Sequence, residues 1–173
     1  MKKFKLLLVL IVACVFTLSH CKEIERITGM GESKKVVPEE PKKAPKPYEV
    51  KNPEPGSPEE VVLNLIKSGL IPDEEQAFEE YLKWHHSDWK STEKSIAERR
   101  NYDWARFRKC SLNLDYVKSK DDLTFTVTRK EEYPDGTIKL FIQTKLPDIM
   151  PKPIKLRKDK EDKDQWRVDY HSL

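Results

Sequence analysis

Residues 154–170 read IKLRKDKEDKDQWRVDY, and this stretch decides the class of fold. Apolar side chains alternate with polar ones at both of its ends, at Ile154, Leu156, Trp166, Val168 and Tyr170. Alternation with a period of two is typical of a strand that buries one face. The residues between the two ends, 158–164, are all charged and favour a solvated turn. The stretch therefore predicts an antiparallel β-hairpin.

Three earlier segments show the same alternation, so we expect five strands in all. Their apolar positions are Leu112, Leu114 and Tyr116, then Leu123, Phe125 and Val127, then Ile138, Leu140 and Ile142. Gly136 follows Pro134 and Asp135 and suits a tight turn, because glycine accepts a positive φ. Short turns predict an antiparallel meander with one apolar face. We expect water to cover the other face, which carries Thr124, Thr126, Thr128, Lys139 and Arg167.

Three helices are expected before these strands. The first is indicated by Ser57 as cap, Pro58 at the first helical position and Glu60 two residues later. The expected caps of the three helices are Ser57, Asp73, and Ser91 or Thr92, and their expected ends lie near Gly69, Trp89 and Lys109. The sequence thus predicts an α+β domain over residues 58–173. In it, two to three N-terminal helices pack on a curved antiparallel sheet of about five strands.

The amino-terminal stretch, MKKFKLLLVLIVACVFTLSHC over residues 1–21, has the layout of a secretory signal. Lys2, Lys3 and Lys5 precede an apolar run from Leu6 to Leu18. The run is short for a transmembrane helix, which needs roughly 20 apolar residues. It is followed closely by Cys21, where an ordinary signal peptide has a small residue.

This arrangement resembles the signal peptide of a bacterial lipoprotein. The resemblance implies that residues 1–20 are cleaved off, that the thiol of Cys21 carries a diacylglyceryl group, and that the new amino group is acylated. His20 departs from the Gly, Ala or Ser that the family usually has at that position. Cys14 follows Ala13 and fits better there, so Cys14 is the alternative lipidation site, although cleavage before it would leave a shorter apolar run.

Residues 21–57 are expected to link the lipidated cysteine to the folded domain. Prolines recur among lysines and glutamates in this segment, at positions 38, 41, 45, 47, 53 and 55. Proline interrupts the hydrogen bonds of helices and sheets, and few large apolar side chains remain to build a core. The segment therefore predicts a disordered tether rich in Pro, Lys and Glu, with no binding role of its own.

The charge of the mature chain argues against a nucleic-acid partner. The sequence has 33 basic and 30 acidic residues, and removal of the three signal lysines leaves 33 − 3 = 30 basic residues against 30 acidic ones. Binding to phosphate backbones requires a surplus of Lys and Arg. Cys110 would be the one thiol besides Cys14 and Cys21, so the domain has no internal disulfide and Cys110 is expected in the core.

Helices followed by a curved sheet that closes with the hairpin 154–170 resemble the NTF2-like and cystatin-like α+β rolls. Where NTF2-like proteins are enzymes, an Asp or His acts as general base in the space between helices and sheet. The resemblance implies a pocket formed by Tyr81, His85, Tyr102 and Asp103. The spacing of the residues also indicates another role for Asp103, because Arg99, Arg100 and Arg106 lie three or four residues away, and any of them is placed to pair with it.

No complete catalytic or metal-binding set is visible in the sequence. His85 and Asp88 have a spacing that suits two metal ligands, but a third ligand is missing, so we expect no metal and no cofactor. We expect a membrane-anchored bacterial envelope lipoprotein whose domain is a non-catalytic interaction or structural module. Its partners would be the membrane, through the lipid anchor, and an envelope protein or cell-wall polymer.

Lys22 after the cysteine resembles the sorting signal of outer-membrane lipoproteins. The alternative function is an NTF2-like pocket enzyme or small-ligand-binding protein that uses the space between helices and sheet.

Overall fold

The computed structural model describes residues 46–173. The expected signal peptide, both candidate lipidation cysteines and most of the expected tether lie outside this range. Within residues 46–173, no helix is both long enough and apolar enough to span a bilayer.

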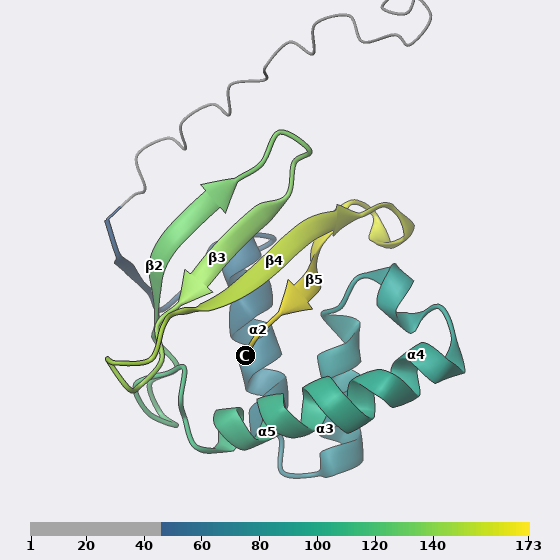
Figure 1. The fold of residues 1–173 in the computed structure, drawn as a ribbon, viewed down its shortest axis with the longest axis horizontal. Coiled ribbons are helices and arrows are strands. Elements are labelled where there is room, and N and C mark those ends of the chain that lie inside the picture. Colours follow the sequence, from purple (N-terminus) through teal and green to yellow (C-terminus); the bar gives the residue numbers. More distant parts are fainter. Residues whose placement is uncertain (1–45) are drawn as a thin grey trace, which may run out of the picture. The chain divides into compact units, whose positions relative to one another are not determined.

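Five strands form one open antiparallel sheet, in which strand order follows chain order (Figure 1). The strands are β1 (Tyr48–Val50), β2 (Phe125–Glu132), β3 (Ile138–Ile142), β4 (Lys152–Asp159) and β5 (Gln165–His171). The last four form the expected meander, and Gly136 adopts a φ of +79° in the β2–β3 turn. The predicted α+β fold, with helices packed on a five-stranded antiparallel sheet, is confirmed.

The helices lie between β1 and β2 in the chain. They are α2 (Pro58–Leu70), α3 (Glu74–Lys83), the short 3-10 turn η1 (Ser87–Lys90), α4 (Glu93–Glu98), the π-helical turn η2 (Arg99–Trp104) and α5 (Ala105–Leu112). A further 3-10 turn, η3 (Lys160–Asp162), lies between β4 and β5. The segments α4, η2 and α5 follow one another directly, and the junction residues keep helical φ and ψ angles. They therefore form one long helix that contains a π-helical turn.

Each main helix begins at the cap that the sequence predicts. The Ser57 hydroxyl accepts a hydrogen bond from the Glu60 backbone N–H (3.2 Å), and the Asp73 carboxylate accepts one from the Gln76 N–H (2.8 Å). Thr92 accepts from the Ser95 N–H (3.1 Å), and the Ser95 hydroxyl in turn accepts from the Thr92 N–H. Such caps satisfy amide groups that have no partner inside the helix, at about 1 kcal/mol each.

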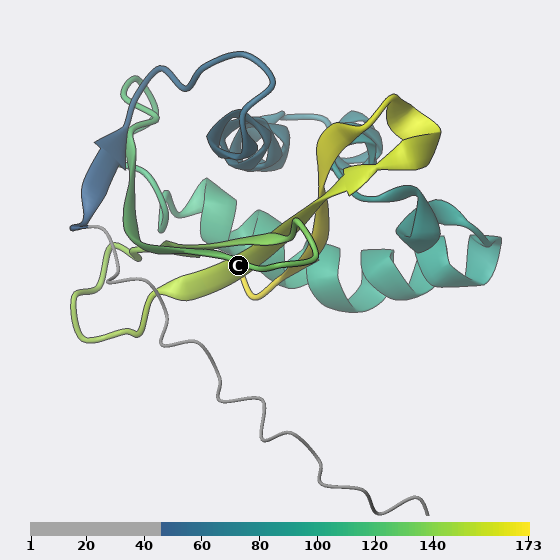
Figure 2. The ribbon, with the colours of Figure 1, turned by 90° about the horizontal axis from the view of Figure 1, so that it is seen from above.

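The helix α2 lies within the curve of the sheet, as Figure 2 shows in a view along the helix. Its buried side chains include Val62, Leu65 and Ile66. The buried apolar side chains of β2 to β5 are Phe125, Val127, Leu140, Ile142, Ile154, Leu156 and Val168. Together with aromatic residues of α3 and α5, these residues form one core. The inward face of the sheet is therefore the one that the alternation predicted.

The prediction of a strand at residues 112–116 is wrong. Leu112 ends α5, and Leu114 adopts a φ of +59°, which an extended strand does not allow. The fifth strand is instead β1, which lies in the segment predicted to be tether and pairs with β2. Proline flanks β1, but Tyr48 anchors it, because its hydroxyl donates to a carboxylate oxygen of Glu59 on α2 (2.8 Å). The folded part thus begins before residue 58.

The helix α3 ends at Lys83 and does not continue to Trp89 as the apolar pattern predicted. After Lys83 the chain turns along the edge strand β5. The Val168 N–H donates to the Trp84 carbonyl (2.8 Å), and the His86 N–H donates to the Val168 carbonyl (3.0 Å). These two bonds satisfy backbone groups at the sheet edge, which compete with the next turn of helix.

The strand β5 contains a bulge that reverses its alternation. Val168 pairs with Leu156 and Tyr170 pairs with Lys155, so Asp169 is an extra residue on this strand. Tyr170, predicted to share the buried face with Val168, therefore points outward and is 49% exposed. His171 takes the inward position opposite Ile154.

The polar side of the sheet is not wholly solvated, contrary to expectation. Thr124 is buried, and its hydroxyl donates to a carboxylate oxygen of Asp122 (2.5 Å). Arg167 is also buried, with its guanidinium over the Trp84 ring at 5.5 Å from the centroid and paired with Asp162. Asp122, just before β2, contacts Thr124, while Trp84 and Asp162 contact Arg167.

Gly69 on α2 offers a test of the contact between α2 and α5. A Cβ atom at this position would lie 2.4 Å from the Ser111 hydroxyl oxygen and 3.0 Å from a Phe107 ring carbon. Overpacking of this kind costs about 1–3 kcal/mol. We expect Gly69→Ala to lower the free energy of unfolding by that amount in urea titrations.

The matched control is the double variant Gly69→Ala with Ser111→Gly, which removes the obstructing atoms. It should recover part of the loss. If Gly69→Ala alone unfolds at the wild-type urea concentration, the close approach of the two helices is contradicted.

Candidate functional site

Tyr81 and His85 occupy the space between the helices and the sheet, and both are buried. They lie one helical turn apart, with ring centroids 4.2 Å from each other, and the His85 Nδ1–H donates to the Tyr81 carbonyl (2.9 Å). The Tyr81 hydroxyl forms a hydrogen bond with Nε2 of His171, at 2.6 Å. The bulge at Asp169 therefore creates a buried Tyr–His–His cluster that alternation would not predict.

Aromatic rings enclose this cluster. Trp104 and Phe107 from the long helix lie with ring centroids 5.0 and 5.1 Å from that of Tyr81, and both side chains are buried. Among the described residues, Nε2 of His85, Nδ1 of His171 and Nε1 of Trp104 have no hydrogen-bond partner. Unpaired buried polar atoms cost about 1–3 kcal/mol each. The cluster therefore makes the folded protein less stable than apolar side chains at the same positions would.

Burial also determines the protonation states of the cluster. Desolvation, with the nearby His171 as a smaller cause, lowers the pKa of His85 to about 3. Desolvation followed by the charges of Arg106 and Arg99 lowers the pKa of His171 to about 3 as well. Desolvation raises the pKa of Tyr81. All three groups are thus neutral near pH 7, whereas an efficient general base has a pKa close to the working pH.

The structure does not bring the four residues of the expected pocket together. The side chain of Tyr102 is 76% exposed on the outer side of the long helix, whereas that of Trp104, two residues later, is buried. Asp103 forms an ion pair with Arg99, at the spacing that the sequence indicated. Tyr81 and His85 are buried among packed rings, and Asp103 acts on Tyr81 through its charge.

Two surface hollows of the described residues lie elsewhere. One, of about 190 Å³, is lined by residues 115–118, 124–126 and 143–145. The other, of about 300 Å³, is lined by residues 48–54, Ser57 and Glu59. Neither contains Tyr81, His85, Tyr102 or Asp103.

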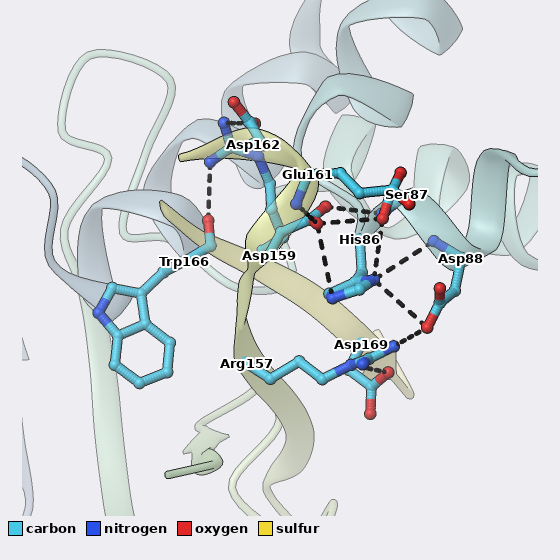
Figure 3. Close-up of polar contacts among 10 residues, drawn as sticks. His86, Ser87, Asp88, Arg157, Asp159, Glu161, Asp162, Trp166 and Asp169 are labelled. Atoms are coloured by element: carbon cyan, nitrogen blue, oxygen red, sulfur yellow. Dashed lines mark hydrogen bonds and ion pairs between the residues drawn. The ribbon is translucent and has the colours of Figure 1, made fainter. Parts of the chain in front are cut away.

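A second polar cluster joins the segment after α3 to the β4–β5 hairpin (Figure 3). The His86 ring lies between Asp88 and Asp159, at 3.5 Å from the first carboxylate and 3.8 Å from the second. Asp159 is buried and accepts hydrogen bonds from the Ser87 N–H (2.8 Å), the Ser87 hydroxyl (3.0 Å) and the Glu161 N–H (3.0 Å). Burial alone would raise the pKa of Asp159, but these donors lower it overall.

The cluster contains the residue types of a Ser–His–Asp triad without its geometry. In a triad the imidazole lies between hydroxyl and carboxylate and accepts the hydroxyl proton. Here the Ser87 hydroxyl donates to Asp159 itself, and its oxygen lies 3.5 Å from Nδ1 of His86. The arrangement holds residues 86–90 against the hairpin and does not activate Ser87.

Ion pairs surround this cluster on the solvent side. Arg157 connects the sheet to the segment after α3. Its Nε donates to Asp169 on β5 (2.9 Å), and another of its nitrogens pairs with Asp88. Asp169 also pairs with Lys155 at 2.9 Å.

The pair His85 and Asp88 does not form a metal site. Asp88 makes its ion pair with Arg157 at the surface, whereas the His85 side chain is buried in the core. Across residues 46–173, three His, Cys, Asp or Glu side chains nowhere gather in a metal-binding arrangement.

Sequence patterns did not indicate that His171, His86 and Asp159 belong to buried clusters. The pair His85-His86 was visible as a group, but Asp159 lies in a run of charged residues that carries no signal for burial.

No protein-family model, no curated protein and no solved structure matches this chain.

The two buried histidines make stability depend on pH. Their pKa is about 3 in the folded protein and near 6.5 when unfolded, so the unfolded state binds more protons between these values. The contribution of the two neutral imidazoles to the free energy of unfolding is fully present above pH 6.5 and is lost as the pH is lowered. We expect a loss of about 2.7 kcal/mol per pH unit for the two groups together, measured by urea unfolding from neutral pH to about pH 4.5.

The variant His171→Gln removes one of the two titrating groups and should halve this slope. A free energy of unfolding that stays constant down to about pH 4.5 would contradict the burial of neutral imidazoles.

Asp159 offers a separate test of the second cluster. In Asp159→Asn the uncharged amide is a weaker acceptor for the three donors, so we expect a loss of about 2–3 kcal/mol in the free energy of unfolding. Asp164→Asn in the same hairpin is the control, because Asp164 is exposed and its φ of +57° suits asparagine. Equal effects of the two substitutions would show that Asp159 has no special role.

Proposed function

We propose that this protein is a bacterial envelope lipoprotein whose α+β domain is a non-catalytic interaction or structural module. The observation that carries the second half of the proposal is the packing around Tyr81 and His85. Rings of Trp104 and Phe107 occupy the place where an NTF2-like enzyme would have its pocket. The same packing argues against the alternative, a pocket enzyme or small-ligand-binding protein.

The chemistry of the buried groups supports a non-catalytic domain. A histidine with a pKa near 3, such as His85, is too weak a base to take a proton efficiently at neutral pH. The Ser87 hydroxyl donates a hydrogen bond to the Asp159 carboxylate, and no imidazole is aligned to accept its proton. Both clusters instead join segments that are distant in the chain, which is a structural role.

The lipoprotein half of the proposal is supported by residues 1–21. The cationic start, the apolar run and Cys21 are the features that the lipoprotein family shares. We assign the lipid anchor to Cys21, with Cys14 as the alternative, and we place the protein at the outer membrane from Lys22. A single acyl chain binds membranes only marginally, so stable anchoring depends on the several chains that such a cysteine receives.

The fold belongs, in this proposal, among the NTF2-like and cystatin-like rolls. A sheet that curves around α2 and closes with the β4–β5 hairpin supports this assignment (Figure 2). Residues between the anchor and β1 would then tether the domain to the bilayer, within reach of an envelope protein or a cell-wall polymer. Fold alone assigns no activity.

The lipid anchor is tested by metabolic labelling of bacteria that express the full chain. With an alkyne analogue of palmitate, we expect label on the wild type and on Cys14→Ser, and a complete loss of label on Cys21→Ser. Mass spectrometry of the amino-terminal peptide should give an acylated Cys21, because cleavage before the cysteine exposes the amino group.

Cys110→Ser is the control, since Cys110 lies in the domain and should not affect labelling. Label that persists in Cys21→Ser and disappears in Cys14→Ser would move the anchor to Cys14. An unmodified amino terminus in every variant would refute the lipoprotein assignment.

A further inference from the structure

The long helix of α4, η2 and α5 presents one side to solvent along an edge of the fold (Figure 1). On this side Tyr102 is 76% and Leu112 is 55% exposed, and Arg106 and Lys109 between them are also exposed. The spacings of four, three and three residues place these four side chains in one row. We call this row, Tyr102, Arg106, Lys109 and Leu112, the outer stripe.

The opposite side of the same helix is held in the core, so the outer stripe has a defined orientation. Trp104 and Phe107 are buried against Tyr81. Arg108 reaches back to the end of α2, where its NH1 donates to the carbonyls of Gly69 (2.9 Å) and Ile71 (2.6 Å). A surface that is already ordered loses little conformational entropy when it binds.

The arginines of this helix divide into two groups. Arg99 and Arg100 pair with Asp103 and Glu75, and Arg108 is occupied by backbone carbonyls. By contrast, neither Arg106 nor Lys109 makes an ion pair with any residue from 46 to 173. The outer stripe therefore has two cations without an ion-pair partner among residues 46–173, although basic and acidic residues of the mature chain are equal in number.

We infer that the outer stripe lies flat on an anionic phospholipid bilayer, as a second contact in addition to the lipid anchor. The choice of a bilayer rests on the proposed location at the membrane. Cations attract anionic headgroups, tyrosine favours the interface between headgroups and acyl chains, and leucine enters the acyl boundary. The anchor keeps the domain close to the bilayer, so the contact is populated more fully than in a protein without the anchor.

Two comparisons favour a bilayer over other anionic partners and over other surfaces. A soluble polyanion would use Arg106 and Lys109 but gains nothing from exposed Tyr102 and Leu112. The other exposed apolar group, Leu146, Ile149 and Met150 between β3 and β4, has Asp148 at the apex of its turn. The carboxylate of Asp148 repels anionic headgroups, although Lys145 and Lys152 flank the loop, so this loop is the competing surface that the vesicle experiment must exclude.

The test uses a protein of residues 22–173, which contains every described residue and neither Cys14 nor Cys21. Binding is measured by co-sedimentation with vesicles that contain phosphatidylglycerol, and with vesicles of pure phosphatidylcholine. We expect binding to the first that falls with added salt, and none to the second. Each cation near an anionic bilayer changes affinity about fivefold, so Arg106→Gln with Lys109→Gln should weaken binding about 25-fold.

The apolar residues and the controls complete the design. Tyr102→Ser with Leu112→Ser should also weaken binding, whereas Leu146→Ser with Met150→Ser should leave it unchanged. Circular dichroism checks that the exposed substitutions preserve the fold. Because no variant carries a lipidation site, the result is independent of whether the anchor is at Cys21.

Three outcomes would overturn the inference. They are no binding to either vesicle, binding that the glutamine variant retains, and binding to polyphosphate that matches vesicle binding and ignores Tyr102→Ser with Leu112→Ser. The last outcome would assign the outer stripe to an anionic polymer.

Discussion

The contact of Trp84 and His86 with Val168 is the constraint on which the rest of this structure depends. Two backbone hydrogen bonds, of 2.8 and 3.0 Å, tie the chain after α3 to the edge of β5. They end the helix, cover part of an otherwise open sheet edge, and aim His85 inward between them. Without them, His86 and Ser87 would not reach Asp159 on the neighbouring strand.

This contact makes the interior partly polar. The ring of His85 joins Tyr81 and His171 inside an aromatic shell, and three nitrogen atoms there have no partner among residues 46–173. A polar cluster of this kind lowers stability compared with an apolar core, and it also ties α3 to the last residues of β5 through the Tyr81–His171 bond. The interior is therefore specific in its pairing, and the rings of Trp104 and Phe107 fill the space beside Tyr81.

Local signals in the sequence were sufficient for much of the fold. Ser57, Asp73 and Thr92 bond to amides three residues away, so each helix start was visible in a short window. The candidate site was visible only in part. Tyr81 and His85 share a helix and stay together, but the position of His171 depends on one extra residue, Asp169, whose effect appears only when β5 pairs with β4.

The sequence by itself determined the caps, the four-stranded meander and the apolar face of the sheet, because these follow from neighbouring residues and from a period of two. It also determined the features of residues 1–21 that support an exported, lipid-anchored protein. Tertiary structure alone decided that Tyr48–Val50 is a strand, that residues 112–116 are not, and that His171 is buried. The physical reason is that pairing energy at a sheet edge and room in the core depend on residues far apart in the chain.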